Sequence, residues 1–161
     1  MRAPPHEPET LFLWQADKIF VNIDGAARNN PGPASIGVVI RTGGERKPVC
    51  LSRFLGTRTN NQAEYEALLA ALRELERRQG RSTPVAVPPV IVIRTDSELL
   101  CRQMTGRYRI KDPQLAALAW AAKRIIARLP GVSFERIPRA ENREADRLAN
   151  RALDRALKLK A

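Results

Sequence analysis

Histidine and cysteine are scarce in this 161-residue sequence. The single histidine, His6, lies in a segment rich in proline and charge, so a Ser-His-Asp mechanism or a histidine general base inside the folded domain is excluded by count. The two cysteines, Cys50 and Cys101, show no paired spacing. We therefore expect both to be small buried hydrophobic residues, and neither a disulfide framework nor a zinc site is indicated.

Long hydrophobic runs are also missing. No uncharged run approaches the roughly 18 residues that span a bilayer, and the first residues, MRAPP, lack the apolar core of a secretion signal. These absences predict a non-secreted, cytoplasmic protein without a membrane partner. The length suits one domain, since about 100–200 residues form one packed core, and a monomer is the default expectation.

The charge balance is strongly basic. Lys and Arg number 28 against 17 Asp and Glu, which gives a formal net charge of +11. A basic domain of this size gains free energy on a polyanion by releasing condensed counterions, so nucleic acid is the favoured class of partner. The alternative is a net charge that only keeps the protein dispersed.

Hydrophobic periodicity divides the chain into a tail and one α/β domain. Residues 1–17 are expected to form a partly disordered N-terminal tail, and residues 18–161 the domain. The predicted strands are 18–24, 34–41, 48–55, 89–96 and 131–138, and the predicted helices are 61–79, 97–104, 113–129 and 141–159. This order, βββ-α-β-α-α-β-α, predicts a mixed sheet with helices covering both faces, and the apolar run at 89–96 suits a strand covered on both sides.

Four carboxylates occupy positions where a solvated acid is unusual. Asp24 closes the first predicted strand, and Asp96 ends the buried strand, at the kind of edge where α/β sheets place ligands. Glu64 falls on the apolar stripe of its helix. Asp146 lies one turn into the last helix, beside that helix's apolar stripe.

Each of the four acids also has a purely local interpretation. Asp24 could begin a turn, Glu64 could occupy the third position of a capping box, and Asp96 could cap the helix that follows it. Asp146 could pair with Arg143 or Arg147 on its own helix. Sequence spacing alone leaves both interpretations open.

If the four carboxylates converge, they must repel one another and raise each other's pKa unless divalent cations neutralise them. A ligand set made only of oxygen atoms points to magnesium or manganese. Metal-assisted chemistry is therefore the reaction class that the sequence allows.

Four segments resemble type 1 ribonuclease H, in matching order, from residue 18 to about residue 155. They are DGAARNNPGPASIG (24–37), TNNQAEYEALLAAL (59–72), IRTDSELLCRQM (93–104) and AENREADRLANRAL (140–153), and each contains one of the four acids. The resemblance implies a ribonuclease H-like five-stranded mixed sheet. It also implies an endonuclease that cuts the RNA strand of RNA–DNA hybrids, leaving 5′-phosphate and 3′-hydroxyl ends.

The resemblance further implies roles for individual residues. Asp24, Glu64, Asp96 and Asp146 would form the catalytic site, binding two Mg²⁺ ions, with Mn²⁺ able to substitute. Substrate contacts are implied as well: Asn30 and Asn60 on the hydroxyl side of the RNA strand, and Thr59 and Asn61 on a phosphate of the DNA strand. Turn and cap chemistry would also account for the asparagines.

Three departures from the family pattern indicate a compact branch. Asn29 stands where the family often has glycine, and asparagine is the residue that best tolerates the same backbone conformation. The loop histidine found in many relatives is missing, and Arg139 is the nearest substitute. A second Lys-rich segment is missing too, so Arg107, Arg109 and Lys111 could supply part of the grip on the substrate or could form an ordinary solvated loop.

Two other functions remain open on the sequence. One is a binding module for hybrids or double-stranded RNA without catalysis, and the other is a related nuclease that acts on double-stranded RNA. The presence of all four acids favours catalysis over the binding module.

Overall fold

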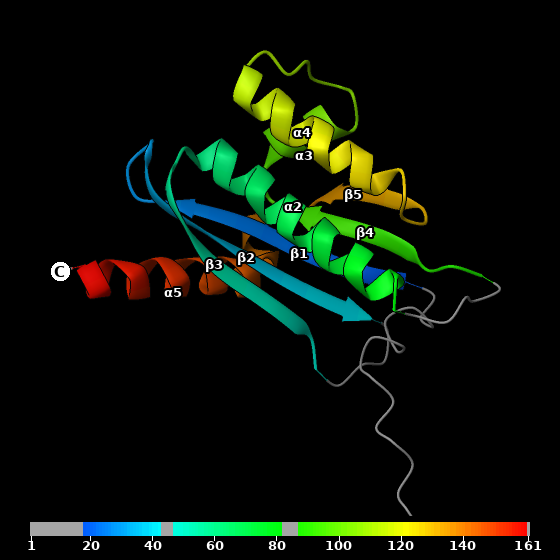
Figure 1. Ribbon diagram of the computed structural model, residues 1–161, viewed down its shortest axis with the longest axis horizontal. Helices are drawn as coiled ribbons and strands as arrows, with labels where there is room; N and C mark the ends of the chain where they lie inside the picture. Colours follow the sequence, from blue (N-terminus) through cyan, green and yellow to red (C-terminus); the bar gives the residue numbers. More distant parts are fainter. Residues whose placement is uncertain (1–17, 43–46, 82–86, 161) are drawn as a thin grey trace, which may run out of the picture.

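The computed structural model describes residues 18–42, 47–81 and 87–160. The predicted tail, residues 1–17, lies outside the described residues, as do residues 43–46 and 82–86. The rest forms one α/β domain, as predicted (Figure 1).

A single five-stranded mixed sheet organises the domain. The strands are β1 (Lys18–Ala27), β2 (Gly32–Thr42), β3 (Val49–Arg58), β4 (Val90–Thr95) and β5 (Val132–Arg136), in the spatial order β3-β2-β1-β4-β5. The first three strands pair antiparallel, while β4 and β5 continue the sheet parallel to β1. The predicted mixed sheet is confirmed.

Four α-helices are present in the described residues: α2 (Asn60–Gln79), α3 (Glu98–Met104), α4 (Pro113–Ile126) and α5 (Arg143–Lys160). A short 3-10 helix, η1 (Arg139–Glu141), precedes α5. Figure 1 shows α2 lying along the sheet with α4 packed against it. A Cβ atom added at Gly25 of β1 would contact the backbone of α2. Gly37 of β2 pairs with Asp24, whose side chain lies on the other face of β1, and a Cβ atom added there would contact the backbone of α5. Helices α2 and α5 therefore cover opposite faces.

The main core lies between α2 and the sheet. Alternate residues of the strands point to this side because successive side chains of a strand face opposite ways. The core contains Ile19, Val21, Ile23, Ile36, Val38, Ile40, Leu68, Leu72, Leu75, Ile91 and Ile93, all of which are at most 1% exposed. Burial of these side chains, at about 25 cal/mol per Å² of apolar surface, fixes the sheet against α2.

Some sequence expectations need correction. Strand β1 continues through Ala27, so Asp24 does not close it but pairs within the sheet, opposite Gly37. Strand β4 is not covered equally on both sides, because Val90 is 45% exposed. Helix α4 ends at Ile126 and α5 begins at Arg143, since η1 occupies the residues before it.

The prediction that both cysteines are buried is wrong. Cys50 is exposed because it lies on β3, the edge strand of the sheet, and Cys101 is half-buried. Both are free thiols. In the described part of the chain, no helix has the length and apolar character that crossing a bilayer requires.

Candidate active site

Asp24 is held in place by the sheet itself. It is only 6% exposed, although it is an acid, and its partner across the strands is Gly37. A Cβ atom at Gly37 would lie 2.0 Å from the carbonyl oxygen of Ala145, so only glycine lets the first turn of α5 approach β2 this closely. The turn interpretation of Asp24 is therefore wrong.

Glu64 projects from the second turn of α2. Thr59 caps this helix: its side chain accepts a hydrogen bond from the Gln62 amide at 3.1 Å, and the Gln62 side chain accepts one from the Thr59 amide at 2.9 Å. Because this capping box is complete without it, Glu64 is not the capping residue. A close approach at Gly25, whose Cβ would lie 2.4 Å from the α2 backbone, brings Glu64 beside β1.

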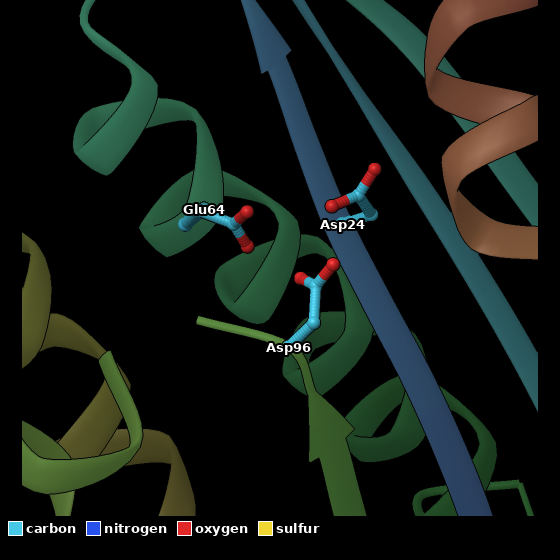
Figure 2. A group of neighbouring side chains, drawn as sticks. All are labelled: Asp24, Glu64 and Asp96. Carbon is cyan, nitrogen blue, oxygen red and sulfur yellow. The ribbon is translucent and has the colours of Figure 1, made fainter. Parts of the chain in front are cut away.

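Asp96 follows β4 directly and does not cap α3. The cap is Ser97, whose side chain accepts a hydrogen bond from the Leu100 amide at 3.2 Å. The Asp96 carboxylate is thereby left to point toward Asp24 on β1 and Glu64 on α2 (Figure 2).

Asp146 is positioned by an asparagine that joins α5 to β1. Asn142, 1% exposed, donates to the Ile23 carbonyl oxygen at 2.9 Å and accepts from the Asn22 side chain at 3.1 Å. The backbone carbonyl oxygen of Asn142 in turn accepts a hydrogen bond from the backbone amide of Asp146. Asn150 donates to Asp146 Oδ1 at 2.9 Å, and Asp146 forms no ion pair among the residues that the structure describes, which excludes the surface salt bridge.

The carboxylates of Asp24, Glu64 and Asp96 point toward one another from β1, α2 and the end of β4 (Figure 2). Their nearest oxygens all lie within 4.8 Å of one another. Burial raises the pKa of Asp24 to about 8, helped by the negative charges of Asp96 and Asp146. Burial, followed by the charges of Asp24 and Asp96, also raises the pKa of Glu64 well above its usual value, against a hydrogen bond from the Gly25 backbone that lowers it.

This cluster fits a divalent cation. Glu64 Oε2 is buried and has no hydrogen-bond partner, an arrangement that costs about 1–3 kcal/mol for a neutral group and more for a charged one. A cation at the centre of the three carboxylates would satisfy that oxygen and offset their mutual repulsion. The donors are all carboxylate oxygens, which suits Mg²⁺ or Mn²⁺ and disfavours softer metals.

One cleft contains the cluster and several further polar side chains. All four acids line it, together with Asn60, Asn61 and Arg139 from the predicted set. Sequence reasoning missed Arg28, Ser97, Arg136 and Asn150, which also line the cleft. Arg28 lies inside the first quoted motif and Asn150 lies one helical turn after Asp146, so both positions carried a signal in the sequence.

The loop between β1 and β2 is tied to the beginning of α2. Asn29 adopts a positive φ of 63°, as expected of an asparagine in a position that favours glycine. The side-chain oxygen of Asn30 accepts a hydrogen bond from the Asn60 amide at 2.9 Å. Asn30 and Thr59 therefore have local structural roles, and both flank the cleft without lining it.

The predicted basic loop is not part of the cleft. Arg107, Arg109 and Lys111 are exposed between α3 and α4, and none of them lines the cleft. In the same loop Tyr108 stacks under Arg102, with the guanidinium 5.1 Å from the ring centre. This placement favours the ordinary solvated loop over a grip on a ligand in the cleft.

Comparison with known proteins finds relatives in sequence and solved structures with a similar fold. The family described as reverse transcriptase-like matches residues 22–152. A bifunctional protein of Mycobacterium tuberculosis is 36% identical over 140 residues, 86% of this chain and 36% of its own length. Ribonuclease HI of Halobacterium salinarum is 38% identical over 139 residues, 86% of this chain and 66% of its own length. The chain thus spans about a third of the mycobacterial relatives.

Among solved structures, LC11-RNase H1 in complex with an RNA/DNA hybrid is similar, with a TM-score of 0.80 and 40% identity. The match covers 87% of this chain and 99% of that protein.

Proposed function

Because the chain belongs to the ribonuclease H type 1 family, we propose that it is a divalent-metal-dependent endoribonuclease that hydrolyses the RNA strand of RNA–DNA hybrids and leaves 5′-phosphate and 3′-hydroxyl ends. The observation that carries the proposal is the cluster of three carboxylates, one buried and two half-buried, that lines the cleft. We also propose that residues 18–161 form a single catalytic domain.

Asp24, Glu64 and Asp96 would hold Mg²⁺ through their facing oxygens, and Asp146 would complete the set from α5. When bound, divalent cations supply the positive charge that lowers the pKa of an attacking water and stabilises the leaving 3′ oxygen. The chain contributes the rigid frame: β1, β4, α2 and α5 each position one carboxylate through backbone contacts, so little rearrangement is needed when a phosphate enters.

Substrate contacts are proposed around the beginning of α2, where backbone amides and the helix dipole favour anions. The Thr59 hydroxyl accepts from Gln62, which leaves its own proton free to donate to a phosphate of the DNA strand, beside Asn61. Asn60 and Asn30, held together at the cleft mouth, are proposed to contact the hydroxyl side of the RNA strand. Arg139, on η1, also lines the cleft and is proposed to contact a backbone phosphate.

A cleavage assay tests the proposal. The substrates are end-labelled RNA–DNA hybrid, double-stranded RNA, double-stranded DNA and single-stranded RNA, each with Mg²⁺, with Mn²⁺ and with chelator. We expect cutting of the RNA strand of the hybrid alone, lost in chelator. Asp24→Asn should abolish cutting while hybrid binding persists, whereas the matched control Glu76→Gln, which changes an acid outside the cleft, should cut normally.

Other outcomes point elsewhere. Cutting of double-stranded RNA at a similar rate would replace the hybrid-specific assignment with a broader nuclease. Tight hybrid binding without any cleavage would replace it with a binding module.

A further inference from the structure

Helix α5 presents a row of positive charge on the side facing away from the sheet. Ala145, Ala149 and Leu153 are fully buried and define its inner face. The opposite face, at about 100° of rotation per residue, carries exposed cations at a spacing of three or four residues. These are Arg143, Arg147, Arg151, Arg155 and Lys158, and we name them the α5 basic stripe.

The charges of the α5 basic stripe are not neutralised by neighbouring acids. None of its five cations forms an ion pair with another residue in the described ranges. Two of the three acids of the same helix are instead paired with residues outside it: Glu144 binds Arg41 of β2 at 2.6 Å, and Asp154 binds Arg28, which directly follows β1, at 2.9 Å. Because these two exposed acids are already paired with arginines from outside the helix, the five cations of the stripe have no pairing acid and leave a patch of positive potential.

A groove runs along this side of α5 and is continuous with the candidate active site. All five cations of the stripe line the groove, together with Asp154, which is paired with Arg28. Asp146 and Asn150 line both this groove and the catalytic cleft. Arg28 stands at the junction, where its guanidinium donates to Asn150 Oδ1 at 3.1 Å and to Asp154 Oδ1 at 2.9 Å. A chain of phosphates leaving the cleft past Asp146 would therefore meet the stripe next.

We propose that the α5 basic stripe binds the sugar-phosphate backbone of the nucleic-acid strand that passes through the cleft, on one side of the cleaved bond. The inference rests on the proposed function for the identity of that strand. From Arg143 to Arg155 the stripe extends about 18 Å at 1.5 Å per residue, which corresponds to roughly five nucleotides at 3.4 Å each. Arginine suits this role because its planar guanidinium donates two parallel hydrogen bonds to a phosphate.

The test compares two triple variants that remove the same charge. The stripe variant is Arg147→Ala/Arg151→Ala/Arg155→Ala, and the control is Arg73→Ala/Arg81→Ala/Lys123→Ala, exposed cations on the opposite side of the molecule. All six side chains are exposed and lack ion pairs among the described residues, so both variants should unfold within a few degrees of the parent.

Two readouts are measured at several KCl concentrations: KM and kcat for a long hybrid in Mg²⁺, and Kd for the same hybrid in chelator by fluorescence anisotropy. Loss of three phosphate contacts should raise both KM and Kd at least tenfold near 0.1 M salt. It should also reduce the salt slope of log Kd by about 2–3, at about 0.9 per contact. The control should stay within twofold of the parent, and the effect on cleavage should fall on KM more than on kcat.

Duplex extensions locate the contact. A duplex with one short hybrid segment is lengthened with DNA duplex on either the 5′ or the 3′ side of the cut. For one of the two extensions only, we expect the gain in affinity that the longer duplex gives the parent protein to be lost in the stripe variant.

Equal Kd values for the stripe variant and the control would overturn the inference, whether or not the protein cuts hybrid. Conversely, if the parent protein cuts no substrate but the stripe variant still has a higher Kd than the parent, the proposed function is refuted and the inference is kept. Loss of affinity independent of either extension would reduce the stripe to a general electrostatic effect and also overturn it.

Discussion

Asp24→Asn should stabilise the metal-free protein, by an amount that grows with pH, at the same time as it abolishes catalysis. The folded pKa of about 8 lies above the ordinary value of 3.8, so between these two limits the folded state keeps a proton that the unfolded state has lost. The free energy of unfolding therefore falls as pH rises through this window. Asparagine has nearly the same shape, does not titrate, and escapes this loss.

The magnitude follows from the shift. pH 7 lies about 3 pH units above the ordinary pKa of 3.8, and each unit corresponds to about 1.4 kcal/mol. The free energy of unfolding of the variant should therefore exceed that of the parent by on the order of 4 kcal/mol. At pH 4 the two proteins should differ little. For a chain of this size about 1 kcal/mol shifts Tm by roughly 2–4 °C, which predicts a difference on the order of 10 °C at pH 7.

Thermal unfolding in chelator from pH 4 to pH 8 measures this difference directly. Saturating Mg²⁺ should stabilise the parent more than the variant and narrow the gap, because a ligand of the native state adds to its stability. Glu76→Gln is the control with the opposite sign: its hydrogen bonds from Arg128 lower the Glu76 pKa, so this variant should lose stability at neutral pH and not in acid. A Tm difference between Asp24→Asn and the parent that stays constant across the pH range would refute the reasoning.

Three further predictions concern the frame of the site. Gly37→Ala should lower both Tm and the cleavage rate, because the added Cβ would lie 2.0 Å from the Ala145 carbonyl oxygen and push the first turn of α5 away. Gly131→Ala is the matched control, since a Cβ atom there would have no neighbouring atom within 4 Å. Equal effects of the two substitutions would contradict the argument from close approach. Thr59→Ala should cost about 1 kcal/mol of stability by urea unfolding through loss of the cap and should raise KM, while Thr59→Ser should restore both. Tyr65→Phe should cost about 1–3 kcal/mol because it leaves the buried Gln103 oxygen, 2.8 Å from the hydroxyl, without its donor; an unchanged Tm would show that this bond contributes nothing.

Most secondary structure could be predicted from periodicity, because apolar alternation in strands and the 3.6-residue repeat in α2 are local properties of the sequence. The errors in element boundaries and burial arose where tertiary contacts determine the structure. Strand β1 extends past Asp24 because β2 pairs with it as far as Ala27, and the small residues Gly25–Ala27 show no alternation of apolar and polar side chains that would indicate a strand. Cys50 is exposed because β3 is the edge of the sheet, and strand order is not a local property.

For the candidate site, the sequence identified the four acids but could not choose between local and convergent interpretations. That choice depended on which neighbour acts as the cap. Thr59 with Gln62 caps α2, and Ser97 caps α3, so neither Glu64 nor Asp96 is needed there. Serine, threonine and aspartate are nearly equivalent caps, which is why composition alone left the matter open. The unpaired charge of the α5 basic stripe was equally invisible, since it depends on which acids are drawn to Arg28 and Arg41 from other elements.

The placement of Asp146 on α5 determines when the proposed active site can be completed during synthesis of the chain. The ribosome delivers a chain from its N-terminal side. The segments that contain Asp24, Glu64 and Asp96 precede α5 in the chain, whereas Asn142, which anchors α5 to β1, and Asp146 emerge only afterwards. Until α5 docks, the nascent chain would thus lack both the fourth carboxylate and the α5 basic stripe. Docking of this one helix would complete the proposed catalytic site and the proposed binding surface in a single step.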